Sequence, residues 1–204
     1  MSPGRPASMS PTPAADSRLQ LSFRPAEASD VLSLHMLATQ VFLDTYATEG
    51  IRPALAREAE QQLSTSAWQA LLQRPGGRIV LAEQAGHLVA FAQLDLRASH
   101  PLVGDAPAAE LCRLYVQAPF QRRGVGRLLL GRAEALARAE SLAVLWLTAW
   151  IGNGRALAFY RSQGYRELGS TRYAFEGEGF ENRLLARSLS AGEATKAAID
   201  ADAG

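Results

Sequence analysis

Gln121-Arg122-Arg123-Gly124-Val125-Gly126 marks the point at which a strand is followed by a helix in this 204-residue chain. The apolar segment before it, Glu110–Val116, predicts a buried strand, and the residues after it open an amphipathic helix. A glycine-bearing turn between a strand and a helix presents backbone N–H groups without partners, with the positive end of the helix dipole behind them. Such a turn is suited to an anion, above all a phosphate or pyrophosphate.

The residues before this turn predict one strand, then helices, then three strands. Alternation of apolar and polar residues predicts the first strand from Leu19 to Arg24. Helical spacing from Asp30 onward predicts a helix that carries Val31, Leu34, Leu37 and Val41 on one side. The further expected elements are helices over 52–64 and 67–73, strands over 78–83 and 87–96, and a loop over 99–107.

The helix after the turn is expected to bury one apolar stripe and to expose a charged face. The stripe consists of Val125, Leu128, Leu129, Ala133, Leu136 and Ala137. Glu134, four residues before Arg138, is expected on the outer face. A strand over 144–150, a helix over 153–163 and strands over 165–175 and 181–189 follow. This order of elements predicts an α/β fold, in which a mixed central sheet has helices on both faces.

Length and composition predict one folded domain over 19–189, with a disordered segment over 1–18 and a flexible tail over 190–204. The formal net charge of +1 gives no global field that would attract nucleic acid or an anionic membrane. Cys112 is the sole cysteine and the three histidines are scattered, so we expect no internal disulfide and no metal site. No apolar run is long enough to span a membrane, and the cytoplasm is the expected compartment.

A second segment carries a recognisable pattern, Asn153-Gly-Arg-Ala156-Leu-Ala-Phe159-Tyr160-Arg-Ser-Gln-Gly164-Tyr165. It resembles the N-x-x-A-x-x-F-Y-x-x-x-G-F/Y stretch of the GNAT N-acetyltransferase superfamily. The segment from Gln121 to Gly126 resembles the Q/R-x-x-G-x-G/A acetyl-CoA loop of the same family. The resemblance covers roughly Leu19 to Leu189. It implies a mostly antiparallel central sheet of about seven strands and direct transfer of an acetyl group from acetyl-CoA to an amine, without a metal.

The resemblance also implies where acetyl-CoA binds. In the family, the strand before the loop splays from its neighbour, and its backbone pairs with the pantetheine arm and the acetyl carbonyl. A backbone N–H at Tyr115 or Val116 would then polarise the thioester. Gly124 and Gly126 would let the backbone approach the pyrophosphate closely. The implied cofactor-binding residues are Leu114, Tyr115, Val116, Gln121, Arg122, Arg123, Gly124, Val125, Gly126, Arg127, Asn153 and Tyr160.

Two residues are the predicted catalytic groups. By resemblance, Tyr160 lies near the thioester sulfur, where a phenol can protonate the departing thiolate. Glu110, at the start of the central strand, is the candidate base for the acceptor amine, although it could equally be a solvated strand end or the partner of Arg113. Asn153 could be a plain helix cap and Tyr160 a core aromatic residue. Arg123 and Arg127 could form a solvated basic rim.

The first helices are expected to wall the acceptor groove. Phe42-Leu43-Asp44-Thr45-Tyr46 resembles the F-x-x-T-Y stretch of GNAT members related to the spermine/spermidine acetyltransferases. The expected acceptor is a polyamine-like or amino-acid-like small molecule, or a peptide amine. Carboxylates that could attract a cationic acceptor are Asp44, Glu49, Glu58 and Glu60.

Other interpretations of the same features lead to different functions. One is an acetyl-CoA-binding sensor with little catalysis, and another is a protein N-terminal or lysine acetyltransferase. A dinucleotide-dependent oxidoreductase is disfavoured because the full G-x-G-x-x-G pattern is absent. A nucleic-acid-binding module is disfavoured because the sequence has no basic face. A homodimer would arise if the closing strand pair joined two subunits.

Overall fold

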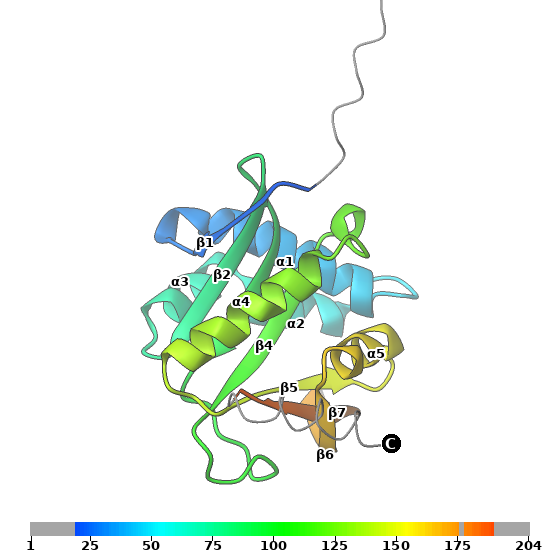
Figure 1. Cartoon of the computed structure of the whole chain (residues 1–204). Coiled ribbons are helices and arrows are strands. Elements are labelled where there is room, and N and C mark those ends of the chain that lie inside the picture. Colours follow the sequence, from blue (N-terminus) through cyan, green and yellow to red (C-terminus); the bar gives the residue numbers. More distant parts are fainter. Residues whose placement is uncertain (1–18, 176–177, 190–204) are drawn as a thin grey trace, which may run out of the picture.

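A seven-stranded sheet forms the centre of the molecule (Figure 1). The computed structural model describes residues 19–175 and 178–189, so the predictions for 1–18 and 190–204 lie outside the described residues. The strands are β1 (Leu21–Pro25), β2 (Gly77–Gln84), β3 (His87–Asp95), β4 (Ala108–Val116), β5 (Val144–Trp150), β6 (Arg166–Phe175) and β7 (Glu178–Ser188). The helices are α1 (Val31–Tyr46), α2 (Pro53–Leu63), α3 (Thr65–Gln73), α4 (Val125–Ala139) and α5 (Gly154–Ser162), with short 3-10 turns η1 (Ala28–Asp30) and η2 (Ala118–Phe120).

The strands are ordered β1-β2-β3-β4-β5-β7-β6 across the sheet. Only the pairing of β4 with β5 is parallel, and the other neighbours run antiparallel. The predicted fold class, a mixed and mostly antiparallel sheet of about seven strands, is therefore confirmed. The closing pair lies within one chain, since β7 pairs with both β5 and β6.

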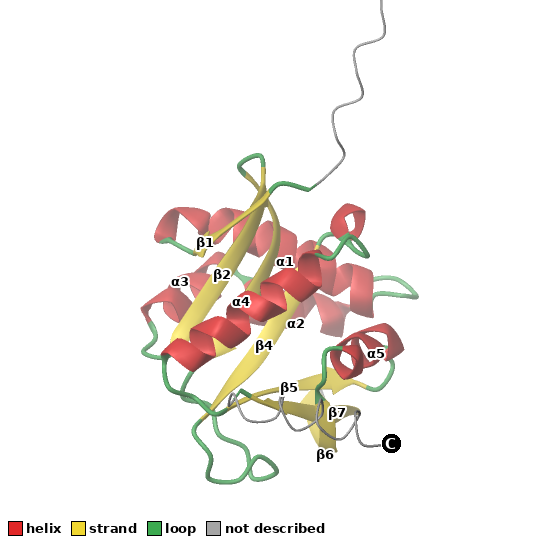
Figure 2. Ribbon diagram, viewed as in Figure 1, coloured by secondary structure: helices red, strands yellow, loops and turns green. Residues whose placement is uncertain are grey.

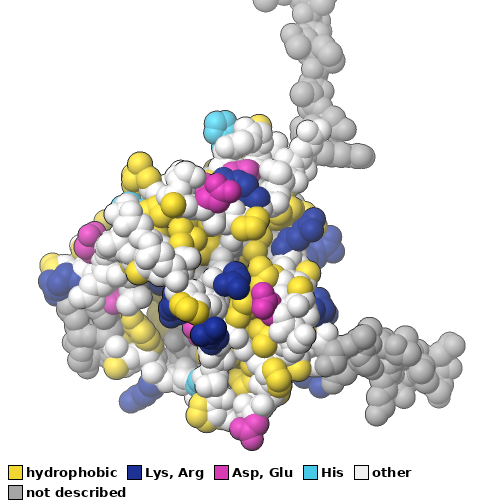
Figure 3. All heavy atoms as spheres, turned by 90° about the vertical axis from the view of Figure 1, so that its left-hand side faces the viewer, with side chains coloured by type: hydrophobic (Ala, Val, Ile, Leu, Met, Phe, Trp, Pro, Cys, Tyr) yellow, Lys and Arg dark blue, Asp and Glu magenta, His cyan; other side chains and the backbone are white. Residues whose placement is uncertain are grey.

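Helices cover both faces of the sheet, as the order of elements predicted (Figure 2). Alternate residues of β2 divide between the two faces, because successive side chains of a strand point to opposite sides. Ile79 and Leu81 pack with α1, α2 and α3 in one cluster. Val80 and Ala82 pack with α4 and α5 in the other. Basic and acidic side chains are interspersed on the face that Figure 3 presents.

Two predictions about α4 are wrong, the position of its apolar stripe and the exposure of Glu134. Leu128 is 49% exposed and Leu130 is buried, so the apolar stripe is rotated from its predicted position. Glu134 is only 6% exposed, although it was expected on the outer face. Its carboxylate turns inward because Arg187 of β7 donates to it at 2.9 Å and the Tyr165 hydroxyl donates at 3.2 Å. These two partners come from later segments, so helical periodicity alone could not indicate them.

None of the helices in the described part of the chain combines the length and the apolar character that crossing a membrane requires.

Candidate functional site

The parallel strands β4 and β5 separate soon after they begin. Their pairing comprises three residue pairs, of which the last joins Glu110 to Trp146. Beyond this point β4 continues to Val116 and β5 to Trp150 without pairing to each other. The described structure therefore has a gap between two central strands, with backbone groups of β4 on one side of it. This separation agrees with the splayed strand that the family resemblance implied.

Strand geometry decides which backbone groups of β4 face this gap. The N–H of Gln117 donates to the carbonyl of Val89 on the β3 side at 3.0 Å. Alternate residues of an antiparallel strand bond to the same neighbour, so the N–H of Tyr115 also points toward β3. The N–H groups of Leu114 and Val116 point the other way. The family resemblance implied that the backbone N–H of Tyr115 or of Val116 would polarise the thioester. Of these two groups, the N–H of Val116 is the one that points into the gap.

A β-bulge in β4 determines which side chains flank the gap. Gln93 pairs with Arg113 and Leu94 pairs with Leu111, so Cys112 is an extra residue on β4. Before the bulge, Glu110 points to the α1–α2 face. After it, the side chains of Arg113 and Tyr115 point to that same face, although simple alternation from Glu110 would turn them away.

The glycine turn lies at the end of β4, on the α4 side of the sheet. The Gln121 side-chain amide donates to the carbonyl of Val116 at 2.8 Å, which ties the turn to the strand. Gly124 is the N-cap of α4, has a positive φ of 83° and provides no side-chain cap. A Cβ built on Gly126 would lie 3.6 Å from the ring of Phe159. The turn, the end of β4 and α5 therefore meet beside the gap.

The α5 helix brings the two predicted residues of the second motif to this place. Asn153 caps the helix, because its Oδ1 accepts from the N–H of Ala156 at 3.0 Å. Its Nδ2 group is not part of that bond. The ring of Tyr160 packs between the rings of Phe159 and Tyr165, with centroid distances of 5.1 and 5.8 Å.

Burial raises the pKa of the Tyr160 phenol above its ordinary value, and the nearby phenols of Tyr115 and Tyr46 raise it further. Tyr160 is therefore a neutral hydroxyl at physiological pH. Tyr115 and Tyr46 belong to the opposite face of the sheet, where they line a pocket. Tyr160 therefore lies close enough to these two residues for their phenols to influence its pKa.

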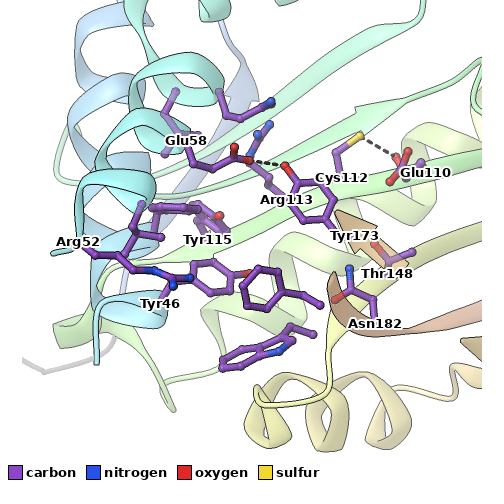
Figure 4. Close-up of a pocket in the computed structure, with 16 residues that line it drawn as sticks. Tyr46, Arg52, Glu58, Glu110, Cys112, Arg113, Tyr115, Thr148, Tyr173 and Asn182 are labelled. Carbon is purple, nitrogen blue, oxygen red and sulfur yellow. Dashed lines mark hydrogen bonds between the residues drawn. The ribbon is translucent and has the colours of Figure 1, made fainter. Parts of the chain in front are cut away.

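That pocket has a volume of about 430 Å³ and lies between the first helices and the sheet (Figure 4). Phe42 and Tyr46 of α1 line it, as the F-x-x-T-Y stretch predicted, whereas Thr45 bonds back to the carbonyl of Val41. The ring of Tyr46 lies 5.9 Å from that of Trp150, so α1 reaches the end of β5. The prediction that the first helices wall a groove is therefore confirmed.

Glu110 lies in the wall of this pocket. Burial raises the pKa of its carboxyl group, and the carboxylate of Asp95, its partner across β3 and β4, raises it further. Arg113 and Arg74 oppose this shift. A carboxylate with a raised pKa is a better proton acceptor than an ordinary glutamate.

These features can be compared with known proteins. The profile of the acetyltransferase (GNAT) family matches residues 43–165. The chain belongs to the GNAT family. An uncharacterized N-acetyltransferase in the pepI 3′ region of Lactobacillus delbrueckii subsp. lactis is 25% identical over 153 residues, which are 75% of this chain and 88% of that protein. A [ribosomal protein bS18]-alanine N-acetyltransferase of Salmonella typhimurium is 33% identical over 78 residues, 38% of this chain and 53% of that protein.

A solved structure has the same fold. The crystal structure of the PaiA N-acetyltransferase from Thermoplasma acidophilum in complex with coenzyme A has a TM-score of 0.66 and 18% sequence identity. The match covers 83% of this chain and 99% of that one. The protein is thus a GNAT enzyme, an acetyl-CoA-dependent acetyltransferase.

Most of the residues that the sequence singled out lie around the pocket or on the α4–α5 side of the gap. Glu110 and Tyr115 line the pocket, while the glycine turn, Val116 and Tyr160 lie toward the α4–α5 side. Among the four acidic residues of the first helices and their loops, Glu58 lines the pocket, and Asp44, Glu49 and Glu60 do not. The described residues contain no group of three or more histidine, cysteine or acidic side chains that could hold a metal ion.

Sequence reasoning missed the far wall of the pocket. Tyr173 of β6, with Phe180 and Asn182 of β7, reaches the pocket from the closing hairpin. The hydroxyl of Tyr173 donates to the carboxylate of Glu58 across the pocket, as Figure 4 shows. No local pattern marks these residues, because they reach the pocket only after the hairpin has paired with β5. The bulge at Cys112 likewise has no signal in the sequence.

Proposed function

We propose that this GNAT enzyme acetylates the primary amine of a small molecule bound in the pocket between α1, α2 and the sheet. The main support is the gap between β4 and β5, because residues of both strands line that pocket and the glycine turn follows the end of β4. A thioester carrier anchored at the turn could reach through the gap to an amine beside Glu110.

Acetyl-CoA supplies the acetyl group as a thioester when it is bound. In this proposal the turn from Gln121 to Arg127 binds the pyrophosphate through the N–H groups at the start of α4. The backbone of Leu114–Val116 and the Nδ2 group of Asn153 bind the pantetheine arm. The N–H of Val116 donates to the thioester carbonyl and stabilises the negative charge that develops there.

Two side chains then accept and donate protons. Glu110 accepts a proton from the acceptor ammonium group, directly or through water, and the amine lone pair forms the new C–N bond. The nitrogen then loses a second proton to solvent as the amide forms. The C–S bond breaks and its electron pair goes to sulfur. Tyr160 donates a hydrogen bond and then a proton to that sulfur, and is reprotonated from solvent. Because burial raises its pKa above that of an ordinary thiol, proton transfer from Tyr160 to the thiolate is uphill, and reprotonation of Tyr160 from solvent completes it.

The test is a thiol-release assay with acetyl-CoA and a panel of polyamines, amino acids, aminoglycosides and peptides, with the products identified by mass. Tyr160→Phe should lower kcat by about 10- to 100-fold, because general acid catalysis contributes at least this much. Calorimetry should give an acetyl-CoA affinity within about threefold of the parent protein. An unchanged kcat would remove Tyr160 from the mechanism.

The panel also separates the alternative acceptors. The relative from Salmonella typhimurium is named for acetylation of an alanine of a ribosomal protein, so a peptide with an N-terminal alanine belongs in the assay. Binding of acetyl-CoA without acetylation of any amine would favour the sensor. The cytoplasmic location and the homodimer stay predictions.

A further inference from the structure

Arg113 places a fixed positive charge in the wall of the acceptor pocket. The bulge at Cys112 turns its side chain toward the pocket, and Figure 4 draws it between Glu58 and Cys112. Its charge lowers the pKa of Tyr46 on α1 and of Tyr173 on β6, against the larger effect of burial. These tyrosines lie on opposite walls, so Arg113 acts on the pocket from a central position.

The contacts of Arg113 are with uncharged groups. Its Nη1 donates to Oε1 of Gln93, and its guanidinium carbon lies 5.7 Å from the centroid of the Trp68 ring. Gln93 is 5% exposed and Trp68 is 1% exposed, so both partners are fixed within the core. Among the side chains that the structure describes, no carboxylate forms an ion pair with the Arg113 guanidinium. Its contacts therefore hold the charge of Arg113 in place, and no described carboxylate neutralises it in an ion pair.

The described charged residues that line the pocket, Arg113 included, sum to no net charge when the carboxylates are ionised. Arg52 and Arg113 carry positive charges, and Glu58 and Glu110 carry negative ones when ionised. The carboxylate of Glu58 already accepts a hydrogen bond from Tyr173. Aromatic side chains supply much of the remaining surface, among them Phe42, Tyr46, Trp150 and Phe180. A polyamine, which is cationic along its whole length, would meet an arginine here without a compensating excess of acidic groups.

We propose, on the basis of the acetyl transfer proposed above, that the acceptor is a free amino acid with an aromatic or large apolar side chain. Its carboxylate binds Arg113, its amine faces Glu110, and its side chain packs among the aromatic residues of the pocket. The guanidinium group suits this task because its planar fork matches the geometry of a carboxylate. A molecule with one positive and one negative group also suits a pocket whose own charges cancel.

The experiment compares acceptors that differ only at the carboxylate. L-phenylalanine is assayed against L-phenylalaninamide and phenethylamine, and L-leucine against L-leucinamide and isopentylamine, each with saturating acetyl-CoA. L-phenylalaninamide also stands for the amino end of a peptide, and spermidine is included as the polyamine. The free amino acids should have kcat/KM values at least about tenfold higher than those of their amides and amines, because a charge-assisted carboxylate contact is lost in the latter.

Variants assign this preference to Arg113. Arg113→Gln should raise KM for the amino acids at least about tenfold, so that the ratio of their kcat/KM values to those of the matching amines falls toward one. Arg113→Lys should retain part of the preference. Arg78→Gln removes an arginine of equal charge from β2, outside the pocket, and should keep the preference unchanged. The preference is a ratio measured within one protein, so the folded fraction of a variant cancels.

Each outcome bears on one of the two proposals. Equal or better use of the amides, the amines or spermidine would overturn the amino-acid assignment and leave acetyl transfer intact. A preference that persists in Arg113→Gln would overturn the role of Arg113. If no amine in either panel is acetylated, both proposals fail together.

Discussion

Gly124 and Gly126 belong to the same turn, but only the backbone conformation at Gly124 requires a glycine. Gly124 has a φ of 83°, which a residue with a Cβ adopts only with strain, although the space around it is open. At Gly126 a Cβ would make ordinary contacts with Phe159 and Val116, at 3.6 and 3.9 Å. The need for glycine is therefore conformational at Gly124 and weak at Gly126.

The two alanine variants should accordingly differ. Gly124→Ala should lower the free energy of unfolding by about 1 kcal/mol and weaken acetyl-CoA binding, since relief of the strain would move the N–H groups of the turn. Gly126→Ala should be neutral or slightly stabilising, because alanine favours the helix, and should bind acetyl-CoA within about threefold of the parent. Urea denaturation and calorimetry measure both effects. Stronger loss of binding in Gly126→Ala would contradict this assignment.

Glu110 should give the enzyme an acidic limb in its pH–rate profile. A base must be deprotonated to act, so kcat/KM should fall as the pH drops through the pKa of Glu110. Burial and Asp95 raise that pKa, so the limb should lie above the range of an ordinary glutamate. Glu110→Gln should abolish this limb and lower the rate.

Asp95→Asn offers an independent check, because it removes a charge that raises the pKa of Glu110. The limb should then move to lower pH, while the limb that reflects the acceptor amine itself stays in place. An acidic limb that is the same in all three proteins would exclude Glu110 as the base.

Single residues were predictable where a motif identified them, and not where backbone geometry intervened. Motifs singled out Glu110, Tyr160 and the turn, which the structure places on β4, on α5 and before α4, and their roles stay predictions. Arg113 was considered only as the partner of Glu110, because without the bulge its side chain would be expected on the other face of β4. A bulge adds one residue to a strand without a characteristic composition, and so the direction of Arg113 was not available from the sequence.

At the level of elements, the periodicity of apolar residues predicted that α4 exists and where it begins, but it did not predict which way Glu134 points. The structure begins this helix at Val125. The direction of Glu134 was wrong, because the buried carboxylate serves Tyr165 after α5 and Arg187 on β7. Arg138 also lies 3.6 Å from it, as the spacing within the helix suggested. Glu134 was expected to face solvent because its two hydrogen-bond partners lie 31 and 53 residues away in the sequence, beyond the reach of a local pattern.

Glu134→Ala should therefore destabilise the protein far more than a surface change on the same helix. Its removal leaves the Arg187 guanidinium and the Tyr165 hydroxyl without their acceptor, which should cost about 2–3 kcal/mol of unfolding free energy. Glu140, at the end of α4, has a 49% exposed side chain, and Glu140→Ala should cost less than about 0.5 kcal/mol. Urea denaturation of both variants tests the contrast, and similar losses would argue against it.

For the whole molecule, the order of elements was sufficient to predict the fold class. One strand, three helices and three strands are followed by a helix, a strand, a helix and two strands, and this order indicated a mixed sheet with helices on both faces. The boundaries were accurate to within about three residues. The pocket was not predictable as a whole. Its walls come from α1 and α2 near one end of the chain and from β6 and β7 near the other, joined by the contact of Glu58 with Tyr173.

The split between β4 and β5 has a kinetic consequence. If the donor and the acceptor bind as proposed, they enter from opposite sides of the sheet, and neither has to depart before the other arrives. Initial-rate plots at several fixed acceptor concentrations should intersect, as for a ternary complex, and parallel lines would indicate a covalent acetyl-enzyme instead. Burial raises the pKa of Cys112 to about 12, which leaves the one thiol near the site a poor nucleophile for such a route. Coenzyme A tethered through its sulfur to an acceptor analogue should bind more tightly than either half alone, because one molecule would then occupy both entrances.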